Sequence, residues 1–514
     1  MKKVNKRMAS LLAEKFPRST IKITQHTGHP SASTLAAVDQ LLLILPAKPP
    51  RELWASVPQG SKVSALLKRR PKASVPGIST RLANKRQTAL HIGMLDIKNE
   101  AFEQLTFARK MQAAASSEKA TCIGIWVLGF KAEDQAIIAE RMIAAALAAA
   151  FNLPHFKAKP NPSKLKSLRL LGLEARLDTA RVVAEANGNN LARWLTAMPP
   201  NKLDATEYLR LLREMSKKQG WTIRKYGVGE LRKLGAGAFL AVAQGNADDS
   251  AAIVRLQYRP KAKSARPELS IIGKGIIFDT GGTNLKPFQS MLEMHIDMGG
   301  SAVALGTLHA ISALKLPFAV DCWLAITENR TGPTAYKPQD VVTAANGKTI
   351  QSIHTDAEGR MALADTLVLA CREKPGLVID FATLTGACIS AVTQRYSGVF
   401  TNRQKWHPVL KKTGVECGER VWPFPMGKEF LEDLKSETAD LKQCSPNASG
   451  DHILAASFLN EFVDRKIPWV HVDLSACMRK GGLAHVPTDI SGFGVRYTMS
   501  LILDRNALGD ADWK

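Results

Sequence analysis

The stretch LSIIGKGIIFDTGG, residues 269–282, decides the architecture of the larger part of this chain. Its apolar residues run almost without interruption to Asp279, as in a strand that is buried on both faces. Lys274 lies inside this apolar run, and a glycine-rich turn follows Asp279. A strand of this kind needs a helix on each face, which predicts a mostly parallel sheet covered on both sides.

Strand-like and helix-like stretches alternate along the rest of the chain. After the opening strand come a helical pattern, a strand, a second helical pattern and a strand, at 298–314, 318–327, 362–373 and 376–384. This order predicts a large C-terminal α/β domain with a mostly parallel central sheet over residues 199–514.

The front of the chain also alternates, with strands at 41–47 and 122–130 and a helix at 133–151. We therefore expect a small, basic N-terminal α/β domain over residues 1–162. A helical pattern over 173–198 stops at Pro199-Pro200, which predicts a linker with a long helix over 163–198.

Composition excludes several classes of protein. Of 514 residues, 45% are hydrophobic and 23% are charged, and no apolar run is long enough to span a bilayer. We expect a globular protein with no membrane partner. The basic stretch 1–16 lacks the apolar core of a signal peptide, and Glu14 argues against a mitochondrial-type presequence. Seven scattered cysteines with no C-x-x-C argue against a disulfide framework and a thiolate zinc site, and for a reducing, cytoplasmic setting.

The basic charge is concentrated in the first part of the chain. Residues 1–200 contain 31 Lys and Arg against 13 Asp and Glu, whereas the other 314 residues contain 39 against 33. One interpretation is a partner with negative charge, such as nucleic acid. The other is a solvated basic surface, which we favour because the sequence shows no nucleic-acid-binding motif and no aromatic residues placed to stack bases.

Charged residues gather where the predicted strands end. The stretch HTDAEGRM, residues 354–361, places Asp356, Glu358 and Arg360 at alternate positions, on one face if the segment is extended. Asp297 begins the next predicted helix, and sites in such sheets lie outside the carboxyl ends of the strands. Four converging carboxylates would repel one another in a low-dielectric cleft, and one or two divalent cations would remove that repulsion.

Each of these residues also has a simpler interpretation. Asp279 alone could be a turn residue or a helix cap, and Asp297 could be an N-cap. Lys274 could be a solvated loop lysine, and Arg360 could form an ordinary ion pair with Glu358. Their joint arrangement at successive strand ends favours a metal centre.

The motifs resemble those of the leucyl aminopeptidases, the M17 family of dinuclear metallopeptidases. The family signature NTDAEGRL appears as HTDAEGRM, and its second motif appears as GKGIIFDTGGTNLKP at 273–287. The segments D-M-G-G, MPPNKL, FLAVAQGN, TAYKPQDVV and ATLTGA are also similar to family segments. The resemblance extends from about residue 185 to residue 500, and it implies that the N-terminal domain is variable.

The resemblance implies a role for each matching residue. Asp279 and Glu358 would bridge two metal ions, Lys274 and Asp297 would complete the tighter site, and Asp356 would complete the more exchangeable site. Zinc is the expected metal, with Mn2+, Mg2+ or Co2+ able to enter the exchangeable position.

The resemblance also implies how the substrate is handled. Lys286 would stabilise the charge that develops on the scissile carbonyl, and Arg360 would hold a bicarbonate ion that carries the proton. The pocket for the first side chain would be lined by Met294, Thr383, Leu384 and Gly386; core packing is the other interpretation of Met294.

Two positions depart from the family signature. His354 stands where Asn is usual, and this change would alter the preference for the second substrate residue, add sensitivity to pH, or be silent. Met361 in place of Leu conserves volume and is expected to be silent.

The sequence therefore predicts a cytoplasmic, metal-dependent aminopeptidase that releases Leu-like N-terminal residues from short peptides. The resemblance implies a homo-hexamer. Two alternatives remain: a nucleic-acid-binding protein that uses the basic N-terminal domain, with or without peptidase activity, and a two-metal phosphoesterase.

Overall fold

The computed structural model describes residues 20–68, 75–116, 120–159, 161–260, 266–447 and 449–509. The expectation for the basic stretch 1–16 lies outside these residues. The chain forms two compact units. The N-terminal unit comprises the described residues up to Ala186 together with Lys480–Asp489, and the C-terminal unit comprises Asn187–Arg479 with the described residues from Ile490. The boundary at Ala186 falls inside helix α7, Ala180–Thr196.

The N-terminal unit contains a six-stranded sheet in the order β1-β6-β5-β2-β4-β3. All neighbours are parallel except β3 and β4, which are antiparallel. The strands are β1 Lys22–Thr27, β2 Gln40–Pro46, β3 Ile78–Arg81, β4 Ala89–Leu95, β5 Cys122–Val127 and β6 Ser167–Leu173. The predicted strands at 41–47 and 122–130 are β2 and β5.

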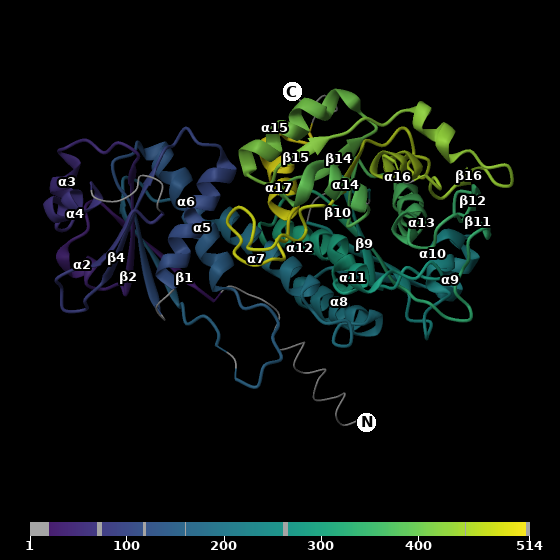
Figure 1. Cartoon of the computed structure of the whole chain (residues 1–514), viewed down its shortest axis with the longest axis horizontal. Helices are drawn as coiled ribbons and strands as arrows, with labels where there is room; N and C mark the ends of the chain where they lie inside the picture. Colours follow the sequence, from purple (N-terminus) through teal and green to yellow (C-terminus); the bar gives the residue numbers. More distant parts are fainter. Residues whose placement is uncertain are drawn as a thin grey trace. The chain divides into compact units, whose positions relative to one another are not determined.

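Helices cover both faces of this sheet (Figure 1). The long helices α5 Ala101–Ser116 and α6 Ala132–Ala150 pack on one face, because their apolar sides enclose a core with Leu42 and Ile44 of β2. The alternating residues Leu41 and Leu43 belong to a second core on the other side, near the short helices α2 Ala32–Leu35, α3 Leu53–Ser56 and α4 Gly60–Leu67.

The C-terminal unit is built on an eight-stranded sheet in the order β15-β14-β17-β13-β9-β10-β8-β7. The four central strands, β17 to β10 in this order, are parallel, and antiparallel pairing occurs toward both edges. The strands are β7 Thr222–Gly227, β8 Ala252–Tyr258, β9 Leu269–Asp279, β10 Val320–Asn329, β13 Leu377–Ala382, β14 Ser397–Thr401, β15 Val421–Pro423 and β17 Trp469–Asp473. The mostly parallel α/β fold predicted from the sequence is confirmed.

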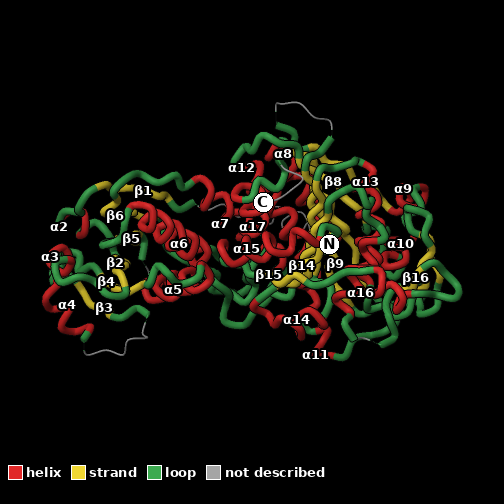
Figure 2. The backbone as a smooth tube through the Cα atoms, turned by 90° about the horizontal axis from the view of Figure 1, so that it is seen from above, coloured by secondary structure: helices red, strands yellow, loops and turns green. Residues whose placement is uncertain are grey.

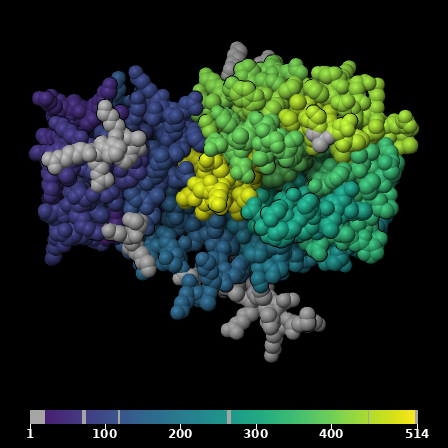
Figure 3. Space-filling view, in the orientation of Figure 1, coloured from purple at the N-terminus to yellow at the C-terminus, as the bar shows by residue number. Residues whose placement is uncertain are grey.

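Smaller elements complete the C-terminal unit (Figure 2). A three-stranded sheet contains β11 Val341–Thr343, β12 Thr349–Gln351 and β16 Leu441–Lys442. The remaining elements are α8 Ala205–Gln219, α9 Val228–Lys233, α10 Gly237–Ala243, α11 Phe288–Met291, η1 Met294–Met298, α12 Gly299–Ala313, α13 Glu358–Arg372, α14 Gly386–Val392, η2 Thr393–Arg395, η3 Gln404–Trp406, α15 His407–Cys417, η4 Lys428–Leu434, α16 Asp451–Asn460 and α17 Val495–Asp504. Teal and green segments that are distant in sequence adjoin on the surface of this unit (Figure 3).

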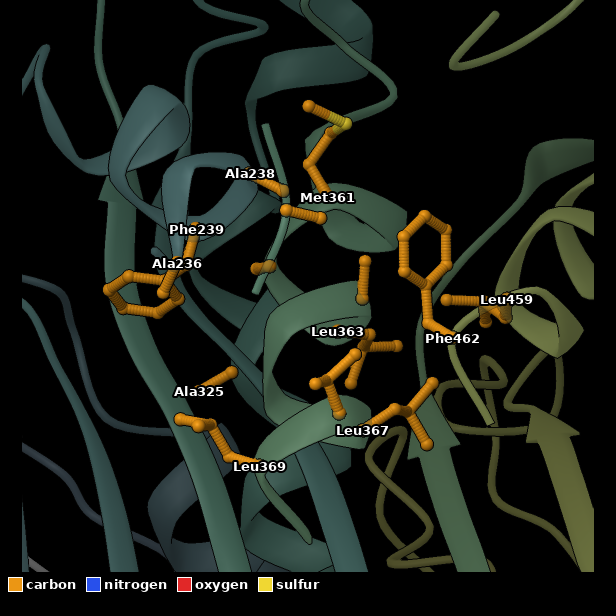
Figure 4. Close-up of a cluster of buried hydrophobic side chains, with 14 of the residues drawn as sticks. Ala236, Ala238, Phe239, Ala325, Met361, Leu363, Leu367, Leu369, Leu459 and Phe462 are labelled. Carbon is orange, nitrogen blue, oxygen red and sulfur yellow. The ribbon is translucent and has the colours of Figure 1, made fainter. Parts of the chain in front are cut away.

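The central strand β9 is covered by α12 and by α13. A side chain at Gly273 would lie 2.4 Å from the Cα of Ser301, so this glycine permits α12 to approach closely. Ile272 and Ile276 instead join the core formed with α13. Figure 4 shows how side chains from α10, α13 and the end of α16, including Met361, Leu367 and Leu459, meet in that core.

Three sequence expectations can be compared directly with these elements. The helix predicted over 173–198 begins only at Ala180, because Leu168, Leu170 and Leu173 are buried in strand β6. All seven cysteines are buried thiols, and each lies outside any disulfide bond. In the part of the chain that the structure describes, we find no helix with the length and apolarity needed to cross a membrane.

Candidate metal centre

Strand β9 presents Lys274 to the first turn of α13. The Lys274 ammonium lies 2.8 Å from Asp297 Oδ1 and 2.8 Å from Glu358 Oε1, and it donates to the Thr383 carbonyl at 2.9 Å. Gly359 makes this possible, because a side chain there would come within 2.6 Å of Lys274 Cε. Lys274 therefore joins three segments that are distant in sequence.

Asp297 lies in the short helix η1, directly before α12, and is buried. Its Oδ1 atom accepts a hydrogen bond from the Thr383 hydroxyl at 2.8 Å. Lys274 thus connects the loop that follows β13 with the segment that precedes α12. The expectation that Asp297 lies at the start of a helix, beside the other charged residues, is confirmed by these contacts.

The segment 354–361 differs from its sequence interpretation. It is not extended: residues 355–356 form a turn, and α13 begins at Glu358. Arg360 accordingly lies within the helix and is buried, and its partner is Asp451 rather than Glu358. The apolar residues from Met361 onward pack in the core at helical spacing, so the helix extends back through the charged residues.

Lys286 provides a second cation beside these carboxylates. Its ammonium lies 2.9 Å from Asp279 Oδ2 and 2.5 Å from Asp356 Oδ1. The turn after β9 returns Lys286 to this position, since its backbone N–H donates to the Thr280 carbonyl at 2.9 Å. We call Asp279, Asp297, Asp356 and Glu358, with Lys274 and Lys286, the metal cluster.

The donor atoms of the metal cluster suit divalent cations. One carboxylate oxygen from each of Asp279, Asp356 and Glu358 lies within 4.8 Å of the others. Asp297 is connected to this group through Lys274. The Oδ2 atom of Asp297 and the Oε2 atom of Glu358 are buried without a hydrogen-bond partner, although buried polar atoms normally have one. A metal ion would satisfy these oxygens, because hard cations and zinc accept carboxylate ligands.

The two lysines respond strongly to the surrounding carboxylates. Burial alone lowers the pKa of Lys274, but the charges of Asp297 and Glu358 outweigh burial and raise that pKa above its ordinary value. Burial likewise lowers the pKa of Lys286, and the charges of Asp279 and Glu358 reverse the effect. A dication held by the same carboxylates would favour the neutral amine instead, which a lysine ligand requires.

The pKa values of two carboxylates are raised as well, and here burial itself raises them. Burial, with the charges of Asp279 and Glu358, raises the pKa of Asp356 to about 7. Burial also raises the pKa of Asp297 well above its ordinary value. Protein groups alone therefore leave the negative charge of the cluster incompletely balanced, in agreement with a site for cations.

Other residues, which the sequence interpretation missed, hold the metal cluster in place. Asn329 donates to Asp279 Oδ1 at 2.8 Å and to the Thr355 carbonyl at 3.0 Å. The Gln443 side chain donates to the Ala357 carbonyl at 3.0 Å. No local motif marks either residue, and the position of Asn329 at the end of β10 was the one available signal.

Arg360 is fully enclosed beside the cluster. Its Nη2 atom donates to Asp451 Oδ2 at 2.7 Å, and its Nη1 atom donates to the Gln443 carbonyl at 3.3 Å. Burial lowers the pKa of Arg360, but the charge of Asp451 outweighs it and raises that pKa. Asp451 is therefore the main counter-charge of this guanidinium.

The four residues expected in a substrate pocket lie on two neighbouring segments. Met294 begins η1 and is half-buried, and Leu384 is half-buried beside the core. Thr383 connects the segments through its bond to Asp297, and Gly386 begins α14 and is exposed. Their role in binding substrate stays a prediction.

The two departures from the family signature occupy different surroundings. His354 is exposed, and its Nδ1 atom accepts a hydrogen bond from the Asp356 N–H at 3.3 Å. Met361 is fully buried in the core (Figure 4). Met361 therefore packs in the core, and the expectation that its replacement of Leu is silent stays a prediction.

Comparisons with known proteins agree with the motifs. Residues 190–499 match the model of the cytosol aminopeptidase family, catalytic domain. A protein of Prochlorococcus marinus described as a "probable cytosol aminopeptidase" is 38% identical over 370 residues, which cover 71% of this chain and 74% of that protein. A protein of Roseiflexus castenholzii with the same description is 38% identical over 333 residues, covering 64% of this chain and 67% of the relative.

Two solved structures share the fold over nearly the whole chain. A mutant of tomato leucine aminopeptidase has a TM-score of 0.83 and 25% identity, covering 94% of this chain and 96% of the other. The leucyl aminopeptidase of Leishmania major, in complex with actinonin, has a TM-score of 0.82 and 22% identity, covering 97% of each chain.

Proposed function

This chain belongs to the cytosol aminopeptidase family, and from that premise we propose that the metal cluster is its active site. The chain is a metal-dependent aminopeptidase, a hydrolase that acts on peptides. The observation that supports this assignment of the site is a pair of buried carboxylate oxygens without hydrogen-bond partners among the described residues, one on Asp297 and one on Glu358, whose other oxygens both contact Lys274. Such an arrangement is costly for stability unless a cation completes it.

The proposed ligands follow the resemblance residue by residue. Asp279 and Glu358 would bridge two divalent ions, Lys274 and Asp297 would complete one site, and Asp356 would complete the other. Zinc is the proposed metal, with Mn2+, Mg2+ or Co2+ at the site of Asp356. Bound divalent ions supply Lewis-acid polarisation of a carbonyl and a water molecule activated as a nucleophile.

The protein groups would position and stabilise the reacting peptide. Lys286 would place its positive charge beside the carbonyl, where negative charge develops during attack. Met294 and Leu384 would offer apolar surface to a Leu-like first side chain, and Thr383 would fix the distance between their segments through Asp297. This combination supports a preference for peptides with an apolar N-terminal residue.

Location and assembly are also part of the proposal. The names of the relatives refer to the cytosol, which supports a cytoplasmic location. A homo-hexamer is proposed from the family resemblance alone, and light scattering that gives six chains per particle would support it. The comparisons offer no support for the nucleic-acid alternative.

The test is turnover of Leu-p-nitroanilide by the metal-loaded wild type and by Glu358→Gln. The variant should lose at least ~100-fold in kcat/KM and about half of its bound zinc, measured by elemental analysis, because a bridging ligand is lost. The matched control is Glu373→Gln at the other end of α13, where Glu373 pairs with Arg255 at 2.7 Å. The control should keep its activity and its zinc.

Two results would contradict the proposal. One is full activity in Glu358→Gln, and the other is a wild type that is inert with every metal tried. Hydrolysis of p-nitrophenyl phosphate without any turnover of Leu-p-nitroanilide would instead favour the two-metal phosphoesterase.

A further inference from the structure

The ion pair between Arg360 and Asp451 raises the question of which anion this guanidinium binds. The resemblance implies a bicarbonate ion on Arg360. In the structure, Asp451 Oδ2 lies 2.7 Å from Arg360 Nη2, and the Gln443 carbonyl accepts from Nη1. Both terminal nitrogens of Arg360 therefore donate to the protein itself, whereas its buried Nε atom has no hydrogen-bond partner in the part of the chain that the structure describes.

Both partners are held by contacts of their own. The Gln443 side chain accepts hydrogen bonds from the N–H groups of Ile353 and His354, so the segment after β16 that contacts Arg360 is fixed to the loop of the metal cluster. Next to Asp451, the His452 ring packs edge-on against Phe424 with centroids 4.5 Å apart. Asp451 is the first residue of α16, so its backbone is held by this helix, while its side chain is partly exposed and pairs with Arg360.

The charges argue against a second anion at this point. Asp451 already supplies one negative charge to Arg360, in an ion pair at 2.7 Å. A bicarbonate ion would add another negative charge beside the Asp451 carboxylate, at a cost that rises in a buried site. A carboxylate and bicarbonate share the same charge and a planar arrangement of oxygens, so one can take the place of the other.

We propose that Asp451 is a built-in replacement for bicarbonate: its carboxylate is the anion on Arg360, and the enzyme works without a dissociable one. This inference rests on the proposed function of the metal cluster. Asp451 acts through Arg360 and is therefore a positioning residue for the reaction. Removal of its carboxylate should expose Arg360 and create a site for bicarbonate that the wild type lacks.

The experiment compares the wild type, Asp451→Ala and Asp451→Asn in buffer freed of carbon dioxide. Wild-type turnover of Leu-p-nitroanilide should be unchanged by added bicarbonate. Asp451→Ala should lose at least ~10-fold in kcat and recover with bicarbonate or formate, whereas the amide of Asp451→Asn fills the space and prevents recovery. Asp134→Ala, which removes an acid from the first turn of α6, is the matched control and should behave as the wild type.

Binding is measured independently of turnover. The 13C resonance of labelled bicarbonate should broaden in the presence of Asp451→Ala and stay sharp with the wild type. Bicarbonate should also raise the Tm of Asp451→Ala, because a ligand that binds only the folded state stabilises it. These two readouts still apply if the metal cluster proves to have another function.

Three results would overturn the proposal. They are stimulation of the wild type by bicarbonate, equal broadening of the 13C resonance by wild type and Asp451→Ala, and full activity of Asp451→Ala without any added anion. If Asp451→Ala does not fold, the wild-type measurements and Asp451→Asn decide the question. An inactive wild type that does not bind metal would contradict the proposed function instead.

Discussion

The two large sheets of this protein have similar architecture, but the polar side chains buried on their strands differ in charge. In the N-terminal unit, the buried polar side chains on described strands are one amide and one histidine, Gln40 and His91, which bond to each other at 2.7 Å. In the C-terminal unit, the central strand β9 buries Lys274 and Asp279. A mostly parallel sheet with helices on both faces therefore does not by itself indicate a catalytic site; buried charge at the strand ends does.

The contrast is clearest between single carboxylates. Asp39 of the N-terminal unit is fully engaged: one oxygen accepts from the Thr121 N–H and hydroxyl at 2.8 Å and from the Cys122 N–H at 3.0 Å. Its pKa is lowered, because these hydrogen bonds outweigh the opposing effect of burial. Asp356 contacts the Lys286 ammonium at 2.5 Å, yet burial and the charges of Asp279 and Glu358 still raise its pKa to about 7. A carboxylate held by several hydrogen bonds supports structure, whereas one with a raised pKa gains from a nearby cation.

The largest expected effect comes from metal removal. Chelation should abolish peptidase activity and lower the Tm, since zinc present at 1,000 times its Kd stabilises the folded state by about 4 kcal/mol. Hydrogen exchange should show the lost protection in β9 and the first turn of α13, while β2 and β5 remain unchanged. Equal loss of protection in both sheets would contradict the prediction that the metal stabilises only the sheet of the C-terminal unit.

The next effect concerns a residue that supports the metal cluster. Asn329→Ala should lower zinc affinity or kcat/KM by about 10–100-fold, because the hydrogen bond that orients Asp279 is lost. The matched control is Asn402→Ala, since Asn402 also makes two hydrogen bonds, to the Ile467 carbonyl and the Trp469 N–H. Zinc titration of both variants measures the difference; equal zinc affinity in the two would show that Asn329 serves structure alone.

The smallest effect is confined to the N-terminal unit. Asp39→Asn should destabilise the folded state by about 1–3 kcal/mol near pH 7, because the NH2 group of the new amide would face N–H and O–H donors where a carboxylate oxygen now accepts. The value of kcat/KM should be unchanged. Because the pKa of Asp39 is lowered in the folded state, the charged carboxylate stabilises that state at pH values above the ordinary pKa of 3.8. This stabilisation is lost as the pH falls through the lowered pKa. Urea unfolding near pH 7 and below pH 4 should therefore show the difference shrinking in acid.

Asp96→Asn is the control for this measurement. Asp96 is exposed, and its Oδ1 atom accepts one hydrogen bond, from the Lys98 N–H at 3.0 Å. The control should change stability by less than about 0.5 kcal/mol. A pH-independent effect of Asp39→Asn would mean that the charge of Asp39 does not stabilise the unit.

The sequence predicted the parts of the site that depend on local pattern. Asp279 follows a buried apolar run and precedes two glycines, so its place at a strand end could be foreseen. The extended form expected for 354–361 was wrong, because the packing of the following apolar residues draws Glu358 and Arg360 into α13. Asp451 could not be foreseen, since it meets Arg360 across 91 residues and no local spacing encodes that contact.

The most direct test of the central claim is an anomalous-scattering map at the zinc edge from crystals of the zinc-loaded protein. The account predicts two zinc ions in the metal cluster, both contacted by Asp279 and Glu358, with Lys274 Nζ bound to one of them as a neutral amine. Lys274 still paired with Asp297, with one zinc ion or none in the cluster, would contradict it.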